Sequence, residues 1–141
     1  MSRIFWDTML FVYLLEDHPA FSERVRALLS RAHRRRDGLC TSYLALGEIM
    51  AGLEKAGKAE AAGSARDALI EMGFSFLPFD SEAVLPFSRL RGQDGIKAPD
   101  AIHLACAAGA GIDLFLTGDK RLVKLDVPGI QFIADFNSSI L

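Results

Sequence analysis

The chain has 141 residues, a length that indicates one domain spanning residues 1–141. Half of its residues are hydrophobic, which argues against an intrinsically disordered chain and is enough for a sizeable core. The formal net charge is −2 at pH 7, which argues against a generally basic nucleic-acid-binding protein but is compatible with nucleic acid held as a substrate by a local patch.

The N-terminal segment does not read as a signal peptide. Asp7 interrupts the apolar stretch that follows Arg3, and no small-residue cleavage site comes after it. The later apolar run, residues 104–112, is far shorter than the ~20 residues that a membrane-spanning helix needs. Cys40 and Cys106 have no metal-ligand spacing around them and indicate no oxidising compartment. We therefore expect a soluble, cytoplasmic protein with no membrane partner.

Short apolar stretches alternate with longer amphipathic ones in the first half of the chain. Gly, Pro and Asp residues mark the ends of these stretches. In chain order, the expected elements are a strand at 3–7, helices at 8–15 and 20–36, a strand at 39–42, and helices at 43–55 and 58–72. Asp7 ends the first strand and is expected to cap the helix that follows it.

The second half of the chain centres on residues 97–119. A helix is expected to begin there with a proline and Asp100, where the helix dipole favours a negative charge. His103 is the only polar residue that follows before Gly109 and Gly111, so this helix should be buried and end at these glycines. The other expected elements are a strand at 74–79, a helix at 80–90, strands at 113–117 and 129–134, a short helical turn at 120–124 and a tail at 135–141.

Strands that alternate with helices predict an α/β fold, with a parallel sheet and helices on both faces. The C-terminal ends of parallel strands share one edge of the sheet, so Asp7 and Asp119 are expected to lie close together there. Asp100 opens the buried helix. Glu48 has small or apolar neighbours three and four positions away on its helix, which allows a close approach to the same edge.

Four carboxylates gathered at one edge repel one another. Two unit charges 4 Å apart cost about 4 kcal/mol at an effective dielectric constant of 20. A divalent cation relieves this repulsion, and an all-oxygen site suits magnesium or manganese, which activate water in phosphodiester displacement. Asp7, Asp100 and Asp119 each have a structural interpretation as well, as a helix cap or dipole partner. The metal-site hypothesis therefore depends on all four acids together.

The four acids lie in the segments FWDTMLFVYLLE, SYLALGEIMAGL, APDAIHLACAAG and FLTGDKRL. These segments resemble the acid-bearing segments of PIN-domain nucleases, and most of all those of VapC-type toxins of toxin–antitoxin pairs. The resemblance extends over nearly the whole chain. It implies a PIN-like three-layer sandwich with a central, mostly parallel sheet, and a metal-dependent endoribonuclease that acts as the toxin of such a pair.

The resemblance also assigns roles to particular residues. The metal ligands carried over residue by residue are Asp7, Glu48, Asp100 and Asp119. Thr117 matches a hydroxyl residue beside the fourth acid, a residue that would orient water or the metal. Gly118 is a local departure, since asparagine is frequent at this position in the family. The implied cofactor is Mg²⁺, with Mn²⁺ as the alternative, and the implied substrate is RNA.

Two protein partners follow from the resemblance, a second copy of the chain and a small antitoxin. The apolar residues at 9–14 cover more faces of their helix than one core needs, which supports a homodimer. The antitoxin is expected to bind over the acidic site, with an arginine that pairs with the carboxylates. An amphipathic antitoxin helix would lie along the early helices.

Other functions and other residues stay open. The alternatives are a catalytically inert PIN-like module that binds RNA or a partner, and a housekeeping RNA-processing nuclease. A haloacid-dehalogenase-type phosphatase is disfavoured because Met9 stands where it needs a second Asp, and Walker and dinucleotide-binding glycine motifs are absent.

His103 is more readily a hydrogen-bonded core histidine than an acid partner. Lys97 is a phosphate ligand or a loop lysine, and the basic run at 33–36 is a helix end or an RNA contact. Asp94 is better explained as a turn residue than as part of the acidic site.

Overall fold

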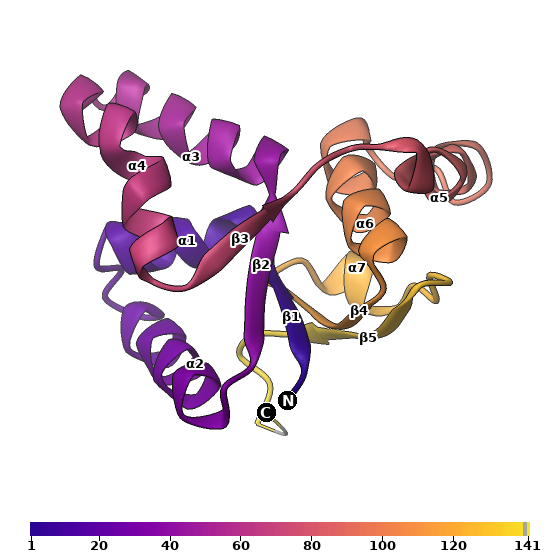
Figure 1. Cartoon of the computed structure of the whole chain (residues 1–141), viewed down its shortest axis with the longest axis horizontal. Helices are drawn as coiled ribbons and strands as arrows, with labels where there is room; N and C mark the ends of the chain where they lie inside the picture. Colours follow the sequence, from indigo (N-terminus) through magenta and orange to yellow (C-terminus); the bar gives the residue numbers. More distant parts are fainter. Residues whose placement is uncertain (140) are drawn as a thin grey trace.

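Parallel strands form the central sheet of the computed structural model, which describes residues 1–139 and 141 (Figure 1). The order across the sheet is β3-β2-β1-β4-β5. These strands are β1 (Arg3–Trp6), β2 (Gly38–Ser42), β3 (Phe74–Leu77), β4 (Ile112–Thr117) and β5 (Ile130–Asp135). Each neighbouring pair of these strands is parallel, so the predicted α/β fold with a mostly parallel sheet is confirmed.

Helices cover both faces of the sheet and complete the predicted three-layer sandwich (Figure 1). They are α1 (Thr8–Leu15), α2 (Ser22–Arg35), α3 (Tyr43–Lys55), α4 (Ala59–Glu71), α5 (Ser81–Gly92), α6 (Ala98–Ala110) and α7 (Lys120–Val123). Helices α1 to α4 pack on one face, and α5 to α7 pack on the other. None of the helices in the described part of the chain is both long and apolar enough to cross a membrane.

Alternating side chains of β1 belong to two separate hydrophobic cores. Trp6 belongs to the core under α1 to α4, where it packs against Phe11 and Phe74. Phe5 points to the opposite face, where its ring stacks on that of Phe115 in β4 at a centroid distance of 4.7 Å. Since β1 is buried on both faces, it forms the centre of the sheet, as expected for a short apolar strand in a parallel sheet.

The pairing of β1 with β4 determines where the acids emerge. The backbone N–H of Asp7, directly after β1, donates to the carbonyl of Leu116 in β4 at 2.9 Å. The chain leaves both strands at the same edge of the sheet, and α1 and α7 begin there. The edge predicted for the acids is therefore formed by adjacent strands that lie about 110 residues apart in the sequence.

Some predicted boundaries are wrong by a few residues. The helix predicted over 20–36 begins only at Ser22. The strand predicted over 74–79 ends at Leu77, because the proline that follows has no N–H for the strand ladder. The strand predicted over 129–134 extends to Asp135, which was expected in the tail.

Gly109 was expected to end the buried helix but lies inside α6. A Cβ atom at this position would come within 3.0 Å of the backbone of Glu82 in α5, so the glycine allows the two helices to pack closely. Gly111 ends α6 as predicted, in the left-handed conformation with φ of 73° that glycine adopts without strain.

Both cysteines are free and buried. Burial raises the pKa of the Cys40 thiol to about 12 and that of Cys106 to about 11. Thiols with such pKa values are protonated at neutral pH and are poor nucleophiles or metal ligands.

Candidate active site

A cavity of about 450 Å³ opens at the edge of the sheet where β1 and β4 end. It is lined by the residues Asp7, Thr8, Met9, Tyr13, Glu48, Asp100, His103, Gly118, Asp119 and Lys120. The four acids singled out in the sequence thus line one cavity, although they come from the ends of two strands and from two helices.

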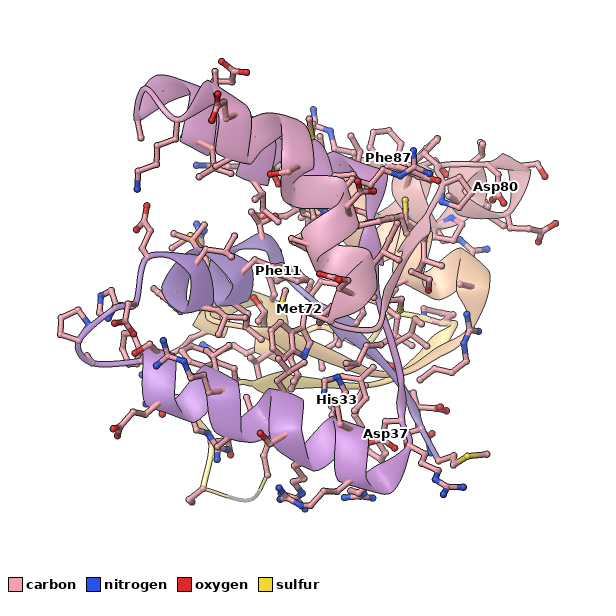
Figure 2. All side chains as sticks on the ribbon, turned by 60° about the vertical axis from the view of Figure 1, so that its left-hand side comes forward. Phe11, His33, Asp37, Met72, Asp80 and Phe87 are labelled. Atoms are coloured by element: carbon pink, nitrogen blue, oxygen red, sulfur yellow. The ribbon has the colours of Figure 1, made fainter. Side chains whose placement is uncertain are left out.

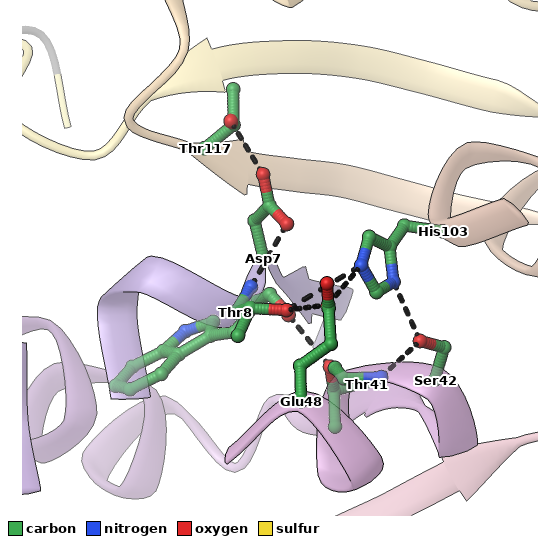
Figure 3. A network of polar contacts seen from close by, with 9 residues as sticks. Asp7, Thr8, Thr41, Ser42, Glu48, His103 and Thr117 are labelled. Carbon is green, nitrogen blue, oxygen red and sulfur yellow. Dashed lines mark hydrogen bonds and ion pairs between the residues drawn. The ribbon is translucent and has the colours of Figure 1, made fainter. Parts of the chain in front are cut away.

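Asp7 is almost completely buried and its two carboxylate oxygens have different partners (Figure 3). Oδ1 accepts a hydrogen bond from the backbone N–H of Thr8 at 2.8 Å, which is the predicted helix cap. Oδ2 accepts one from the Thr117 hydroxyl at 2.8 Å. The Thr117 oxygen in turn accepts from the N–H of Asp119 at 3.0 Å. Thr117 therefore links the first acid to the loop that carries the fourth.

Glu48 projects from α3 and is held at a single oxygen (Figure 3). Its Oε1 accepts a hydrogen bond from the Thr8 hydroxyl at 2.7 Å and lies 2.7 Å from Nε2 of His103. The hydrogen bond from His103 is the main cause that lowers the pKa of the Glu48 carboxyl, with a smaller contribution from Thr8, while burial opposes both. Glu48 is therefore a carboxylate whose negative charge the fold stabilises.

Asp100 lies in the first turn of α6 and receives no such support. Within the described residues, no hydrogen bond reaches its side chain. Burial raises the pKa of the Asp100 carboxyl, and the negative charges of Asp7 and Asp119 raise it further. Interactions with His103 and Arg121 lower this pKa by less, so the site contains negative charge that the protein itself does not fully compensate.

Asp119 follows β4 and turns toward its own loop. Its Oδ1 accepts from the backbone N–H of Arg121 at 2.9 Å, which caps α7, and from the guanidinium Nε at 3.1 Å. Oδ2 accepts from Nη2 of Arg121 at 2.8 Å. These contacts hold the pKa of the Asp119 carboxyl below its usual value. Because the Arg121 side chain is 74% exposed, the ion pair is a weak surface interaction that another cation can replace.

The family of the chain follows from comparison with known proteins. Residues 4–128 match the family model of the PIN domain. The chain belongs to the PIN-domain family. No curated protein matches its sequence.

The fold of this PIN domain is similar to those of solved VapBC and FitAcB structures. VapBC2 from Rickettsia felis, bound to a DNA fragment from the promoter, aligns with a TM-score of 0.75 and 18% identity over 94% of this chain and 97% of that chain. DNA-bound VapBC from Salmonella typhimurium aligns with a TM-score of 0.74 and 21% identity over 96% and 99%. FitAcB from Neisseria gonorrhoeae aligns with a TM-score of 0.64 and 22% identity over 82% and 87%. At these identities, the similarity shows a shared fold.

The acids of the PIN domain line the cavity without surrounding one point. Among residues 1–139 and 141, no three Asp, Glu, His or Cys side chains are placed to hold a metal ion as they stand. Asp119 is engaged by Arg121, and the oxygens of Asp7 are engaged by Thr8 and Thr117. The donor chemistry nevertheless fits a hard divalent cation, because all the candidate ligands are oxygens and the pKa of the Asp100 carboxyl, which has no hydrogen bond or ion pair among the described residues, is raised.

Thr8 and Ser42 were not expected from the sequence to contact residues of the site. Thr8 donates to Glu48, and Ser42 lies 2.7 Å from the His103 ring. The sequence indicated only their local position, because each stands at the start of a helix, where Ser and Thr are common. Their long-range partners depend on the packing of α1, α3 and α6. His103 is the hydrogen-bonded core histidine that was expected, with 2% exposure, and it contacts an acid as well.

The remaining candidates lie at or outside the cavity. Lys97 is exposed at the N-terminus of α6, and its charge contributes to the lowered pKa of Asp119. Asp94 lines a different cavity beside α5, in agreement with its interpretation as a turn residue. The basic run at 33–36 lies where α2 ends and leads into the start of β2, whereas Asp7 and Asp119 follow the C-terminal ends of β1 and β4. Figure 2 shows His33, the first residue of the run, beside Met72.

Proposed function

We propose that this PIN domain is a Mg²⁺- or Mn²⁺-dependent endoribonuclease, the toxin of a toxin–antitoxin pair acting in the cytoplasm. The observation that carries the proposal is the cavity lined by Asp7, Glu48, Asp100 and Asp119, with the charge of Asp100 not fully compensated. The fold shared with toxin–antitoxin proteins supports the assignment to such a pair. We also propose that residues 1–141 form one domain, because both hydrophobic cores share a single sheet.

Each of the proposed ligands has a distinct role in the proposed site. Asp100 and Oε2 of Glu48 accept no hydrogen bond from the described residues, so they offer oxygens without rearrangement of protein hydrogen bonds. Asp7 and Asp119 would join them, Asp119 by exchanging Arg121 for the metal. A bound divalent cation supplies Lewis acidity to the phosphodiester and a nucleophilic water. Thr117 orients Asp7 through its hydroxyl.

The test is cleavage of a single-stranded RNA in the presence of Mg²⁺, Mn²⁺ or EDTA. We expect cleavage with either metal, none in EDTA, and none with Asp7→Asn, which removes a ligand charge at nearly constant volume. The matched control is Asp94→Asn, since Asp94 is exposed and lines a different cavity. Cleavage that persists in EDTA or in Asp7→Asn would contradict the proposed mechanism.

The proposed antitoxin has a groove to occupy beside the acid cavity. The groove lies between α1 and α3 and is lined by Val12, Leu15, Glu16, Glu48, Ile49, Gly52, Leu53, Ala56 and Lys58. Glu48 lines both the groove and the acid cavity, so a helix laid in the groove would bring its polar side chains to the carboxylates. An arginine of the antitoxin is the fitting group, because its planar fork pairs with carboxylate oxygens.

The antitoxin is tested by expression in a bacterial host. We expect the wild-type chain alone to slow growth, Asp7→Asn to be harmless, and co-expression with the product of a small adjacent reading frame to restore growth. Leu15→Arg in the groove should weaken copurification of the two proteins, whereas Leu85→Arg, at an exposed leucine of α5, should not. A partner that copurifies but leaves RNA cleavage unchanged would contradict this part of the proposal.

A homodimer remains part of the proposal, although its support from α1 is weaker than the sequence indicated. Leu10 and Phe11 are completely buried in the core of the monomer, and Tyr13 packs against the same core. Met9 and Leu15 are each 44% exposed and leave only part of α1 for a partner. Light scattering should give about twice the chain mass of 15.4 kDa, and a monomer at high micromolar concentration would contradict a homodimer.

A further inference from the structure

His103 occupies a buried position where four segments of the site meet (Figure 3). It lies on α6, one turn after Asp100, with 2% of its surface exposed. Its Nδ1 lies 2.7 Å from the hydroxyl of Ser42, at the junction of β2 and α3. Its Nε2 lies 2.7 Å from Oε1 of Glu48 and 3.4 Å from the Thr8 hydroxyl. Both ring nitrogens are therefore used in contacts with other elements.

The surroundings of Ser42 assign the hydrogen on the His103 ring. The Ser42 oxygen accepts a hydrogen bond from the backbone N–H of Ala45 at 3.0 Å, as the cap of α3. Ser42 is fully buried, and its own hydroxyl proton needs an acceptor, which Nδ1 of His103 provides. We assign the ring hydrogen to Nε2 on this basis. It then points at Glu48, where an unprotonated nitrogen would repel the carboxylate.

Both donors at Glu48 act on the same oxygen. Thr8 and His103 each bond to Oε1, and the other oxygen has no hydrogen bond within the described residues. The carboxylate is thereby fixed in orientation with one oxygen occupied and one available. A carboxylate held in this way loses less conformational freedom when it binds a cation than a freely rotating one does.

We propose that His103, held by Ser42, is a positioning residue that fixes the Glu48 carboxylate with Oε2 available for the divalent cation. The inference rests on the proposed metal site but goes beyond it, since His103 and Ser42 are not ligands. Removal of an outer partner of a metal ligand typically costs about 10- to 100-fold in metal affinity. We expect a loss of about 10-fold when His103 is replaced by an apolar residue, because Thr8 still holds Oε1.

The experiment measures Mn²⁺ binding to the purified full chain without RNA, by electron paramagnetic resonance of the free ion. His103→Leu removes the donor to Glu48 and should raise the dissociation constant for Mn²⁺ about 10-fold. His103→Gln places an amide N–H₂ near the position of Nε2 and should restore affinity to within about threefold of wild type. Both variants lose the ring, so a merely structural role of His103 would affect them alike. The melting temperature of each variant establishes that it is folded.

Two further variants keep the test decisive. If His103→Leu does not fold, His103→Asn replaces it in the comparison with His103→Gln. The shorter amide of asparagine does not reach Glu48, so this variant should bind Mn²⁺ weakly. Ser42→Ala removes both a helix cap and the hold on the ring, and should weaken Mn²⁺ binding. Its control is Asp80→Ala, which removes the cap of α5 away from the cavity and should leave Mn²⁺ binding unchanged.

Glu48→Gln separates failure of this inference from failure of the proposed function. If Glu48→Gln weakens Mn²⁺ binding but neither His103→Leu nor His103→Asn does, Glu48 is a ligand and the positioning role of His103 is wrong. Equal weakening by His103→Gln and His103→Leu also overturns the positioning role. If Glu48→Gln itself leaves Mn²⁺ binding unchanged, Glu48 is not a ligand of the proposed metal site, and the positioning role of His103 is wrong with it.

Discussion

Glu48 and Asp100 line the same cavity, yet the fold treats their charges in opposite ways. Two donors hold one oxygen of Glu48, and the pKa of its carboxyl is lowered, chiefly by the hydrogen bond from His103. Asp100 has no hydrogen bond among the described residues, and burial together with Asp7 and Asp119 raises the pKa of its carboxyl. One side of the cavity is thus preorganised, and the other carries charge that lacks a partner.

The difference between these two acids indicates how the proposed metal site divides its tasks. The Glu48 side of the cavity supplies a fixed geometry. The folded protein loses stability only if the partners of Glu48 are removed. The Asp100 side supplies unneutralised negative charge, which destabilises the folded protein until a cation binds. Substitutions that remove the two charges should therefore agree in their effect on catalysis and disagree in their effect on stability.

The largest expected effect is on RNA cleavage, where the two acids should behave alike. Asp100→Asn and Glu48→Gln each remove a proposed ligand, so each should lower the cleavage rate with Mg²⁺ by about 100-fold or more. This is at least as large as the loss that follows removal of a residue that only contacts a ligand, which is about 10- to 100-fold. Single-turnover cleavage of a labelled RNA measures this. Glu54→Gln, on the exposed face of the same helix as Glu48, should leave the rate unchanged. Full activity in either ligand variant would remove that acid from the site.

A smaller effect is expected for the stability that Mg²⁺ adds. An ion bound only by the folded state at ten times its dissociation constant adds about 1.4 kcal/mol to the free energy of unfolding, or roughly 4 °C in melting temperature. Differential scanning calorimetry with and without Mg²⁺ measures this rise. It should shrink in Asp100→Asn and in Asp119→Ala. Identical melting curves of the wild type with and without Mg²⁺ would show that the cavity binds no such ion.

In the absence of divalent ions, Glu48→Gln should lower the free energy of unfolding by about 1 kcal/mol, because the hydrogen bonds from Thr8 and His103 then reach a neutral oxygen. The pKa of Glu48 is lowered by folding, so this contribution is present above the unfolded-state pKa and is lost as the pH falls through the folded-state pKa. Urea unfolding at neutral and acidic pH measures it. A difference from wild type that persists below both pKa values would contradict the electrostatic origin.

The smallest expected effect has the opposite sign. Asp100→Asn should raise the free energy of unfolding by about 0.5 kcal/mol without divalent ions, a modest value because the side chain is only half buried and solvent screens the repulsion. The pKa of Asp100 is raised by folding, so the gain should be full above the folded-state pKa and vanish below the unfolded-state pKa. The same urea series measures it, with Asp94→Asn as the control. Destabilisation by Asp100→Asn at neutral pH would mean that the charge of Asp100 has a partner.

The site could be predicted only in part from the sequence. The ends of apolar stretches placed Asp7 and Asp119 after strands, and the structure has both acids there as helix caps. The partner of His103 could not be predicted, since a buried polar residue in an apolar helix shows only that some partner exists. Ser42 likewise showed its role as a cap but not its contact with His103, because that contact joins residues 61 positions apart.

Local patterns by themselves determined the element order, the parallel sheet and the acids at element ends. Apolar periodicity, helix-ending glycines and cap residues act over a few sequence positions, so they can be recognised in the sequence alone. Only the tertiary structure decided which acid is held and which is repelled. The charge of Glu48 depends on the packing of α6 and α1 against α3, and that of Asp100 on its distance from Asp7 and Asp119. Hydrogen bonds and electrostatic interactions depend on distances in space, and these distances are fixed only when the sheet brings remote segments together.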